Sequence, residues 1–591
     1  MKQELETAVA AACKKLFNVD VDVELTRPDE QFGDFATNVA LQLAKSLGKN
    51  PREAGTALAE ELKALPEVKD ASIAGPGFVN LTLSDDALRT AVKKAPSALT
   101  KTYDGQLVVL EYSDPNPFKV LHAGHLYQTI YGESVANLLT AAGADVHRVN
   151  FGGDVGLHVA KTMWAILDDF GGEHPEKLAD IPEGERAEWM ARCYVAGTRA
   201  YDEDEVAKAE IVGLNTRVYE LFTSNDRDSS FAQIYWTCRQ WSYDYFNAFY
   251  ASVGTTFEKY YPESSTAPLG LKTVKEQLAK GVYEESDGAV VFRGEPYGLH
   301  TRVFINSNGL PTYEAKDVGL VMSKWSDYHF DRTIIITGND IVEYMKVVLK
   351  SIEQFEPELV KRTTHVTHGQ LKLAGGVKMS SRKGNFFRAV DVLEAAREAS
   401  REATGRDDEA MILGSVKYAF LKQRIGPDVI YDPKESVSLE GNSGPYLQYA
   451  HARARSIIKK VSGIQTFDRG GSSVVQSDGL QAQSPEERPR ETHTSGESLD
   501  AASSLFEAGE RSLLRKISEY PEVVDRAVNE LMPHHICTYL YELAQTFNRF
   551  YEHNHVVGDP REALRLKLVE EYADTLQAGL TLLGIAAPEQ I

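Results

Sequence analysis

Cysteine is scarce in this sequence: the 591 residues contain four, at Cys13, Cys193, Cys238 and Cys537. No two of them form a Cys-x-x-Cys pair. Disulfide frameworks and zinc sites both need paired or clustered cysteines, so the spacing argues against both and predicts no bound metal. Unpaired thiols are typical of a reducing compartment, and we expect a cytoplasmic protein.

Long apolar runs are absent as well. No stretch of 18 apolar residues occurs, so the sequence predicts no membrane-spanning helix. The first 15 residues carry two glutamates and lack the apolar core of a secretion signal. We therefore expect a protein without a membrane partner.

Basic residues are outnumbered by acidic ones. The 64 lysines and arginines stand against 86 aspartates and glutamates, which gives a net charge of -22. Net charge governs solubility and non-specific association, and an acidic protein can still carry a local basic groove. The charge balance therefore neither predicts nor excludes a nucleic-acid partner.

The length predicts three to four domains, at about 150 residues each. Residues 1–100 are predicted to form a small α/β domain. Their alternating stretch through Val21, Val23 and Leu25 predicts a strand, and residues 36–47 predict a helix.

Residues 101–400 are predicted to form a Rossmann-type, nucleotide-binding α/β domain around a parallel sheet. The apolar run 107–112 predicts a buried strand, a helix follows near Gly124, and a second strand begins at Asp145. This order is a βαβ unit, whose two strands are parallel. The stretch from about 160 to 260 is acidic, and we expect a solvated helical insertion there.

The helical pattern of residues 401–591 predicts a C-terminal helical bundle. Its stretch 462–498 is rich in serine, glycine, glutamine, proline and charge, and we expect it to be disordered. The predicted fold class is therefore multidomain α/β plus α, with a small N-terminal α/β domain, a parallel-sheet domain and a helical bundle.

The strongest chemical signal lies between the first strand and first helix of the parallel-sheet domain. The sequence there is Ser113-Asp-Pro-Asn-Pro-Phe-Lys-Val-Leu-His122-Ala-Gly-His125. A helix N-terminus binds anions through its free N–H groups and its dipole. His122 and His125 share one helix face and can both donate hydrogen bonds to an ATP phosphate, while Gly124 lets a ribose or base approach the backbone. Two incidental histidines at a helix start are the alternative.

A second segment, Lys378-Met-Ser-Ser-Arg-Lys-Gly384, follows a glycine pair. Three cations and two hydroxyls on such a loop suit a mobile clamp on pyrophosphate, because charge-assisted hydrogen bonds are strong. By itself the segment also fits a solvated basic loop. Together the two segments predict activation of a carboxylic acid by ATP. The predicted catalytic cations are Lys378, Arg382 and Lys383, and the predicted ATP contacts are Met379, Ser380 and Ser381.

The two segments resemble the HIGH and KMSKS motifs of class I aminoacyl-tRNA synthetases. Further pieces resemble arginyl-tRNA synthetases in particular: Glu111-Tyr-Ser-Asp-Pro-Asn116, Gly309-Leu-Pro-Thr-Tyr-Glu-Ala-Lys-Asp317, Gly441-Asn-Ser-Gly-Pro-Tyr-Leu-Gln-Tyr-Ala-His-Ala-Arg453, and Phe32-Gly-Asp-Phe-Ala-Thr-Asn38 with Ala74-Gly-Pro-Gly-Phe78. The resemblance covers nearly the whole chain apart from the acidic insertion and residues 462–498. It implies an enzyme that activates L-arginine with Mg-ATP and transfers it to the 3′ end of tRNA(Arg), with activation that needs tRNA.

One position departs from the family pattern. Ser381 stands where KMSKS has its second lysine. Many arginyl-tRNA synthetases share this loss, and a lysine just before the first motif is thought to replace its charge. The resemblance assigns that role to Lys119, three residues before His122, with Lys383 as the other candidate.

Arginine recognition needs acids, because the planar guanidinium pairs with carboxylates through parallel hydrogen bonds. Tyr313 and Asp317 are four residues apart, which places them on one helix face. An ordinary exposed helix face is the alternative for this pair. The resemblance implies an arginine site formed by Glu111, Ser113, Asn116, Tyr313, Asp317 and, on a looser match, Asp340.

The resemblance also implies tRNA contacts at both ends of the chain. Aromatic rings at helical spacing stack unpaired anticodon bases, and neighbouring cations bind phosphate. A core helix with buried tyrosines is the alternative in the helical bundle, and a packing role is the alternative for Phe78. The implied contacts are Tyr446, Tyr449, Arg453 and Arg455 for the anticodon, and Asn38 and Phe78 for the tRNA elbow.

Two other functions remain open. The nearer one is an enzyme of the same class with another amino acid, which the acidic site residues disfavour. The other is a catalytically silent tRNA-binding or regulatory relative, which the intact motifs and Lys119 disfavour. We expect a monomer whose partners are tRNA(Arg), L-arginine and ATP with Mg2+.

Overall fold

The computed structural model describes residues 1–97, 99–374, 387–461, 463 and 506–591. They divide into two compact units. One contains Met1–Lys94, Arg453–Ser518 and Thr546–Ala573, and the other contains Ala95–Ala452, Glu519–Gln545 and Asp574–Ile591. The predicted pyrophosphate clamp and, apart from Gly463, the stretch 462–498 lie outside the described residues. No described helix is long and apolar enough to cross a membrane.

A five-stranded parallel sheet forms the centre of the larger unit, with the strand order β11-β10-β4-β5-β6. The strands are β4 (Leu107–Glu111), β5 (Asp145–Gly152), β6 (Lys259–Pro262), β10 (Arg332–Gly338) and β11 (Thr363–His368). β4 and β10 are buried over most of their length, as central strands of a helix-covered parallel sheet are. The predicted parallel-sheet fold is confirmed.

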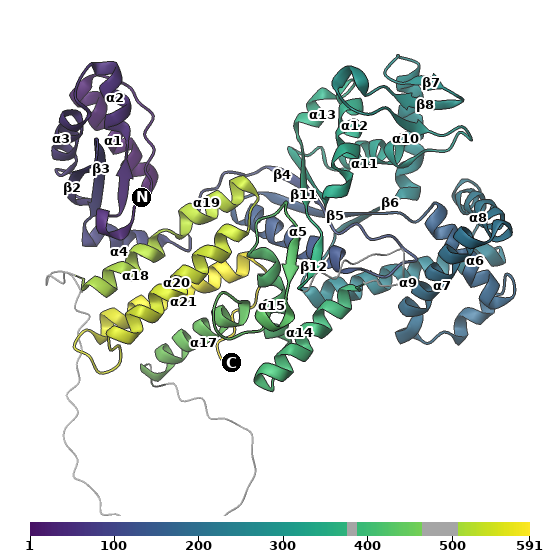
Figure 1. The fold of residues 1–591 in the computed structure, drawn as a ribbon. Coiled ribbons are helices and arrows are strands. Elements are labelled where there is room, and N and C mark those ends of the chain that lie inside the picture. The colour runs from purple at the N-terminus through teal and green to yellow at the C-terminus, as the bar shows by residue number, and fades with distance from the viewer. Residues whose placement is uncertain (98, 375–386, 462, 464–505) are drawn as a thin grey trace, which may run out of the picture. The chain divides into compact units, whose positions relative to one another are not determined.

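Helices cover both faces of this sheet. Figure 1 shows α5 (Ala123–Ala141) on one side and α11 (Tyr313–Tyr328) with α12 (Val342–Glu353) on the other. Val109, Val149 and Val318 lie in the core between strands and helices. The same region contains α10 (Glu263–Leu278), α13 (Pro357–Lys361), and an antiparallel sheet of β7 (Glu284–Ser286), β8 (Ala289–Phe292) and β9 (Arg302–Ile305).

The strand order reverses at β4. The chain runs from β4 to β5 on one side, while β10 pairs with β4 on the other, so that Ile335 lies opposite Glu111. Open α/β sheets bind ligands in the crevice at the carboxyl ends of strands where the order reverses. The segment from Ser113 to His125 begins at this crevice.

The insertion lies between β5 and β6 and is helical: α6 (Leu157–Phe170), α7 (Arg186–Glu203), α8 (Glu205–Thr223) and α9 (Ser230–Val253). It has a hydrophobic core of its own, which includes Trp189, Ile211 and Tyr235. A Cβ at Gly197 would lie 1.9 Å from the Lys161 carbonyl oxygen, so α7 packs directly on α6. The insertion is helical, as expected, and it also buries a core, because its apolar residues face inward at helical spacing while the acids face water.

The first 94 residues pack helices against a three-stranded antiparallel sheet of order β1-β3-β2. The elements are α1 (Lys2–Phe17), β1 (Phe35–Thr37), α2 (Val39–Leu47), α3 (Pro51–Leu62), β2 (Val68–Ala74), β3 (Phe78–Leu83) and α4 (Asp85–Lys94). The strand predicted through Val21 and Leu25 is absent, since the Leu25 N–H donates to a Glu6 carboxylate oxygen at 3.0 Å. Next to it, Thr26 forms an isolated bridge with Ala36.

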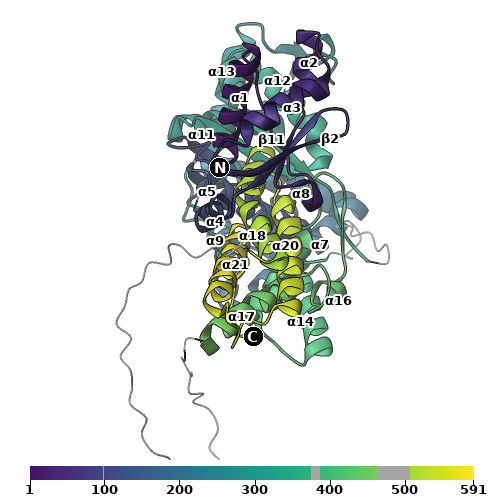
Figure 2. The ribbon, with the colours of Figure 1, turned by 90° about the vertical axis from the view of Figure 1, so that its left-hand side faces the viewer.

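The remaining residues that the structure describes are mainly helical, as predicted. Its helices are α14 (Ala389–Thr404), α15 (Glu409–Leu421), α16 (Pro433–Ser436), α17 (Gly444–Val461), α18 (Ala508–Ser518), α19 (Tyr520–Glu530), α20 (His534–His553) and α21 (Glu562–Leu582), with β12 (Leu371–Leu373) and β13 (Val429–Tyr431) as a short parallel pair. α20 and α21 run side by side in both views (Figure 1, Figure 2). Arg511 of α18 contacts Asp34 at 2.6 Å and Asp85 at 2.9 Å, which explains why α18 belongs to the same unit as the first 94 residues.

Candidate active site

Two histidines cap the helix that follows β4. His122 is the N-cap of α5, and its Nδ1 accepts the backbone N–H of His125 at 3.2 Å. In return, Nδ1 of His125 accepts the backbone N–H of His122 at 3.1 Å. The two rings stack with their centroids 3.6 Å apart. This is a capping box made of two imidazoles.

The capping fixes the protonation of both rings. Because each Nδ1 accepts a hydrogen bond, the proton of the neutral ring sits on Nε2. Burial and the charge of Lys119 lower the pKa of His122 to about 4. Burial, His122 and Lys119 hold the pKa of His125 well below its ordinary value. Both imidazoles are therefore neutral at pH 7 and carry Nε2–H donors.

Gly124 is required by the histidines themselves. A Cβ at Gly124 would lie 2.9 Å from the imidazole of His122. The glycine therefore lets the His122 ring fold over the first turn of α5, in addition to leaving the helix start open to a ligand.

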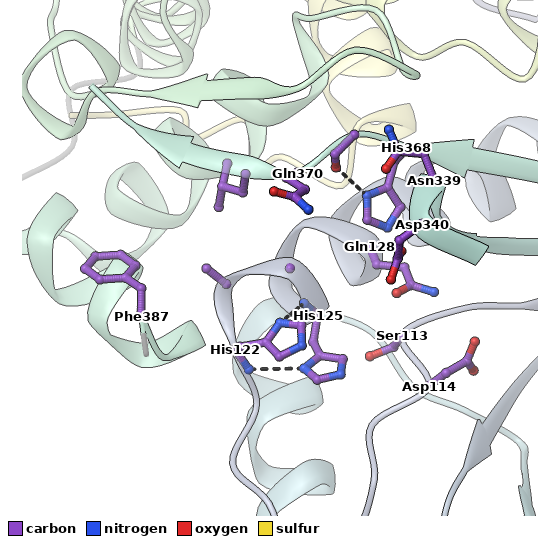
Figure 3. A pocket seen from close by; sticks show the side chains of 15 residues that line it. Ser113, Asp114, His122, His125, Gln128, Asn339, Asp340, His368, Gln370 and Phe387 are labelled. Carbon is purple, nitrogen blue, oxygen red and sulfur yellow. Dashed lines mark hydrogen bonds between the residues drawn. The ribbon is translucent and has the colours of Figure 1, made fainter. Parts of the chain in front are cut away.

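A cavity of about 430 Å³ opens in front of this helix start. Figure 3 shows His122 and His125 on one side, with His368, Asn339 and Asp340 on another. The cavity is also lined by Ser113, Asp114, Ala123, Gly124, Gln128, Gly338, Gly369, Gln370, Leu371 and Phe387. Its walls thus come from the carboxyl ends of β4, β10 and β11 and from the N-terminus of α5.

His368 is a site residue that the sequence did not point out. Its Nδ1 lies 2.8 Å from the carbonyl oxygen of Gly369, so Nδ1 carries the proton and Nε2 is an acceptor. That Nε2 is buried and has no hydrogen-bond partner among the residues that the structure describes. Burial lowers the pKa of His368, which keeps the ring neutral. The only sequence signal was a histidine followed by a glycine in the stretch 363–369.

The loop between β4 and α5 is strained and tied to β5. Ser113, Asp114 and Phe118 have φ angles of 77°, 47° and 67°, in the left-handed region that non-glycine residues rarely adopt. The Asp114 carboxylate accepts the N–H of Phe151 at 2.9 Å, and the Asn116 amide oxygen accepts that of Gly153 at 2.7 Å. These bonds hold Asn116 at the edge of the site.

Two of the predicted arginine-binding acids have different environments. Glu111 is buried and ion-paired with the buried Lys324, which neutralises it. Asp317 is also buried, but its hydrogen-bond donor is the neutral hydroxyl of Tyr344. Burial raises the pKa of Asp317 to about 7, and Glu111 contributes in the same direction. Burial and Glu111 likewise hold the pKa of Asp114 well above its usual range.

The other predicted arginine-site residues differ in how directly they face the site. Ser113 is buried, with its hydroxyl 2.9 Å from that of Tyr250. Tyr313 is 58% exposed at the start of α11. Asp340 lines the cavity together with His368 and the histidine cap, whereas Asn116 and Lys119 line a second cavity that shares His122 and His125 with the first.

The predicted tRNA-binding side chains differ in how exposed they are. Tyr449 is 47% exposed on α17, whereas Tyr446 is half-buried with its ring 5.8 Å from that of Tyr541. The guanidinium of Arg453 lies 4.8 Å from the ring of Tyr551. Arg455 is half-buried. The elbow candidates are both accessible: Phe78 is 40% exposed and Asn38 is exposed.

The predicted clamp residues Lys378, Met379, Ser380, Ser381, Arg382 and Lys383 lie outside the described residues. Within the described ranges, no group of three or more histidine, cysteine, aspartate or glutamate side chains is arranged to hold a metal ion.

The chain is similar to known proteins over its whole length. Curated proteins named arginine–tRNA ligase from Porphyromonas gingivalis and Phocaeicola vulgatus are 29% and 28% identical, over 100% of this chain and 99% and 100% of theirs. The solved arginyl-tRNA synthetases of Thermus thermophilus and Plasmodium falciparum have a TM-score of 0.75 each, at 23% and 19% identity, over 100% of this chain and 100% and 99% of theirs. At these identities the likeness to the two structures is one of fold.

Family models match three successive parts of the sequence. The model described as Arginyl tRNA synthetase N terminal domain matches residues 3–83, and the one described as DALR anticodon binding domain matches residues 447–591. The model described as tRNA synthetases class I (R), catalytic domain, matches residues 88–430. This range is more than half of the chain and includes the histidine cap, the acids Glu111 and Asp317, and the residues that line the cavity. The chain therefore belongs to the class I tRNA synthetases (R).

Proposed function

We propose that this protein is an arginine–tRNA ligase, which activates L-arginine with ATP and transfers it to the 3′ end of tRNA(Arg). One observation carries the proposal. A nucleotide-sized cavity at a histidine-capped helix start is lined by Asp114, whose pKa is raised in part by the charge of a buried carboxylate, Asp317. The hydrogen-bond donor of Asp317 is uncharged. A bound guanidinium would supply the missing cation.

The first step is an in-line displacement. A carboxylate oxygen of arginine attacks the α-phosphorus of Mg-ATP, and the bond to the pyrophosphate oxygen breaks. Negative charge grows on the α-phosphate oxygens, where the Nε2–H groups of His122 and His125 and the N-terminus of α5 stabilise it. No side chain forms a covalent intermediate, so catalysis rests on positioning and charge.

The second step transfers the aminoacyl group. A hydroxyl oxygen of the terminal tRNA ribose attacks the carbonyl carbon of arginyl-adenylate, and the bond to the phosphate oxygen breaks. AMP leaves, taking the electron pair of the broken bond, and the proton of the attacking hydroxyl leaves with it. The same histidine donors stabilise the phosphate as a leaving group.

The arginine side chain fits the acidic side of the crevice. Asp317 pairs with the guanidinium, and Tyr313 covers the guanidinium from the start of α11. Asn116 and Ser113 line the adjoining part of the site. Because Lys324 neutralises Glu111, we assign Glu111 to shaping the pocket through this pair. Asp340 lies with His368 on the nucleotide side, which supports a contact to the ATP ribose better than one to arginine.

His368 is proposed to select adenosine. Its unpartnered Nε2 accepts a hydrogen bond from the adenine amino group or a ribose hydroxyl. His368→Phe keeps the ring packing against Tyr127, whose centroid is 5.0 Å away, but loses the acceptor. We expect KM for ATP to rise by about fivefold to tenfold, with KM for arginine unchanged. Steady-state pyrophosphate exchange measures both constants.

The matched control for this variant is His365→Phe on the same strand. His365 bonds to Thr337 at 2.7 Å and does not line the cavity. An unchanged KM for ATP in His368→Phe would contradict the adenosine contact.

Lys119 is proposed to supply the charge that Ser381 lacks. Lys119→Ala is expected to lower the rate of arginine activation by about tenfold to a hundredfold while arginine affinity stays nearly intact. Lys119→Arg should retain part of the rate, because it keeps the charge. Pre-steady-state formation of arginyl-adenylate tests this, and a wild-type rate in Lys119→Ala would move the role to Lys383.

The remaining proposals concern the domains that bind tRNA and the cation that accompanies ATP. We divide the chain into an elbow-binding domain (1–100), a catalytic domain (101–400, with the insertion at about 160–260) and an anticodon-binding domain (401–591). Tyr449, Arg453 and Arg455 are proposed for the anticodon, with Tyr446 mainly packing, and Asn38 and Phe78 for the elbow. We further propose that Mg2+ enters with ATP, that the clamp residues bind pyrophosphate, and that the protein is a cytoplasmic monomer.

The deciding experiment is aminoacylation of bulk tRNA with each amino acid in turn. Charging with arginine alone is the expected result. Charging with a different amino acid would overturn the specificity, and tRNA binding without any charging would favour a silent relative.

A further inference from the structure

We propose that Tyr194, on α7 of the insertion, is a positioning residue that holds the ammonium of Lys119 beside the histidine cap. The inference rests on the proposed role of Lys119 in activation. This role of Tyr194 gives the insertion a part in catalysis, because α7 of the insertion then supports the charge of Lys119.

The contact lies in the second cavity, of about 620 Å³. Its lining includes Lys119, His122 and His125 from the loop and the start of α5, and Tyr194 with its neighbours on α7. Nζ of Lys119 lies 4.6 Å from the centroid of the Tyr194 ring, within the range of a cation–π interaction.

Cations outnumber carboxylates in the lining of this cavity, and the carboxylate of Glu263, whose pKa the charge of Lys119 pulls downward, is already paired with Lys316 at 2.6 Å. The cavity is lined by three further cations, Arg192, Arg199 and Arg388, and by one carboxylate, Glu188. Arg388 is paired with Asp391 at 2.7 Å, but Arg192 and Arg199 have no ion pair in the described part of the chain. Lys119 has no ion pair there either. Like charges alone would drive the ammonium into solvent, and the negative face of the ring opposes this.

The ring is held by the packing of α7. Trp189, Met190 and Cys193 of this helix are buried in the core of the insertion. Three residues after Tyr194, Gly197 brings α7 against the backbone of α6. The packing therefore fixes the part of α7 that carries Tyr194 against α6, and Lys119, on a loop bonded to β5, lies 4.6 Å from the Tyr194 ring.

This arrangement fixes the position of the Lys119 ammonium before substrate binds. A flexible lysine samples many rotamers, and one held against a ring loses fewer of them when it reaches a phosphate. Tyr194 thus acts on the rate of activation through Lys119 and has no direct part in binding arginine.

The test is a double-mutant cycle on the full-length protein. The variants are Tyr194→Leu, Tyr194→Phe, Lys119→Ala and the double variant Tyr194→Leu/Lys119→Ala. Arginine-dependent ATP–pyrophosphate exchange with tRNA(Arg) present gives kcat and the KM values, and thermal unfolding reports the fold. Tyr201→Leu is the matched control, because Tyr201 on the same helix makes the same kind of contact with Lys161 at 4.3 Å, away from both cavities.

We expect Tyr194→Leu to lower kcat by about 3- to 30-fold with KM for arginine unchanged, and Tyr194→Phe to restore most of the rate. In the Lys119→Ala background the Tyr194→Leu change should cost nothing further. An equal loss in both backgrounds, an equal loss in Tyr194→Phe, or a loss in Tyr201→Leu would overturn the proposal. If Lys119→Ala itself keeps the wild-type rate, the proposed role of Lys119 fails, and the inference about Tyr194 with it.

Discussion

Asp317→Asn is expected to lower kcat/KM for arginine by about a hundredfold to a thousandfold. The carboxylate is buried on α11, and its hydrogen-bond donor, the Tyr344 hydroxyl, carries no charge. The asparagine amide keeps the size of the side chain but cannot neutralise a buried guanidinium, and an uncompensated buried charge costs about 3–5 kcal/mol. Steady-state exchange with arginine as the varied substrate measures the loss.

The same carboxylate predicts a pH dependence of arginine binding. Burial raises the pKa of Asp317 to about 7, so the group is partly protonated in the empty site at neutral pH. Only the ionised form pairs with the guanidinium, which stays charged throughout. Arginine affinity should therefore be full above pH 7 and weaken as the pH falls through 7, by about tenfold per unit further below.

Two controls separate this effect from damage to α11. Asp327→Asn changes an acid near the other end of the same helix, where it pairs with Lys259 at 2.6 Å outside both cavities, and should leave activity near wild type. In Asp317→Asn the pH dependence of arginine binding should disappear. A pH-independent KM in the wild type, or a normal KM in Asp317→Asn, would remove this residue from the arginine site.

His122→Asn is expected to lower kcat for activation by about a hundredfold or more while leaving stability nearly unchanged. Asparagine is a good N-cap, so its amide oxygen can still accept the backbone N–H of His125. It lacks the Nε2–H donor, and loss of one donor to a developing phosphate charge costs about 2.7–4 kcal/mol. Pre-steady-state adenylate formation and thermal unfolding, measured together, separate the two roles of this histidine.

His122→Ala provides the comparison. It removes the cap as well as the donor, and we expect an added destabilisation of about 1 kcal/mol. If His122→Asn were as active as the wild type, the histidine would serve α5 alone and the phosphate donors would lie elsewhere.

Local patterns predicted the catalytic part of the molecule well. The strand at 107, the helix near Gly124 and the strand at 145 follow from apolar runs and their spacing, and the structure contains all three. The stretch through Val21 and Leu25 has the alternation of a strand, yet a glutamate side chain takes the Leu25 N–H. Alternation reports which side chains are buried, and Val23 and Leu25 are buried, but it does not report which group pairs with the backbone.

The sequence by itself determined the chemistry: the histidine pair at a helix start, the acid four residues after Tyr313, and the lysine before the first motif are all set by residue type and spacing. Tertiary structure alone decided how the environments of these groups differ. It neutralised Glu111 with Lys324, 213 residues away, and within the described part of the chain it gave Asp317 a hydroxyl partner and no ion pair. It also brought His368 to the cavity and Tyr194 to Lys119. Pairings of this kind depend on how strands and helices distant in the chain pack together, and burial, which sets the pKa of each acid, exists only after that packing.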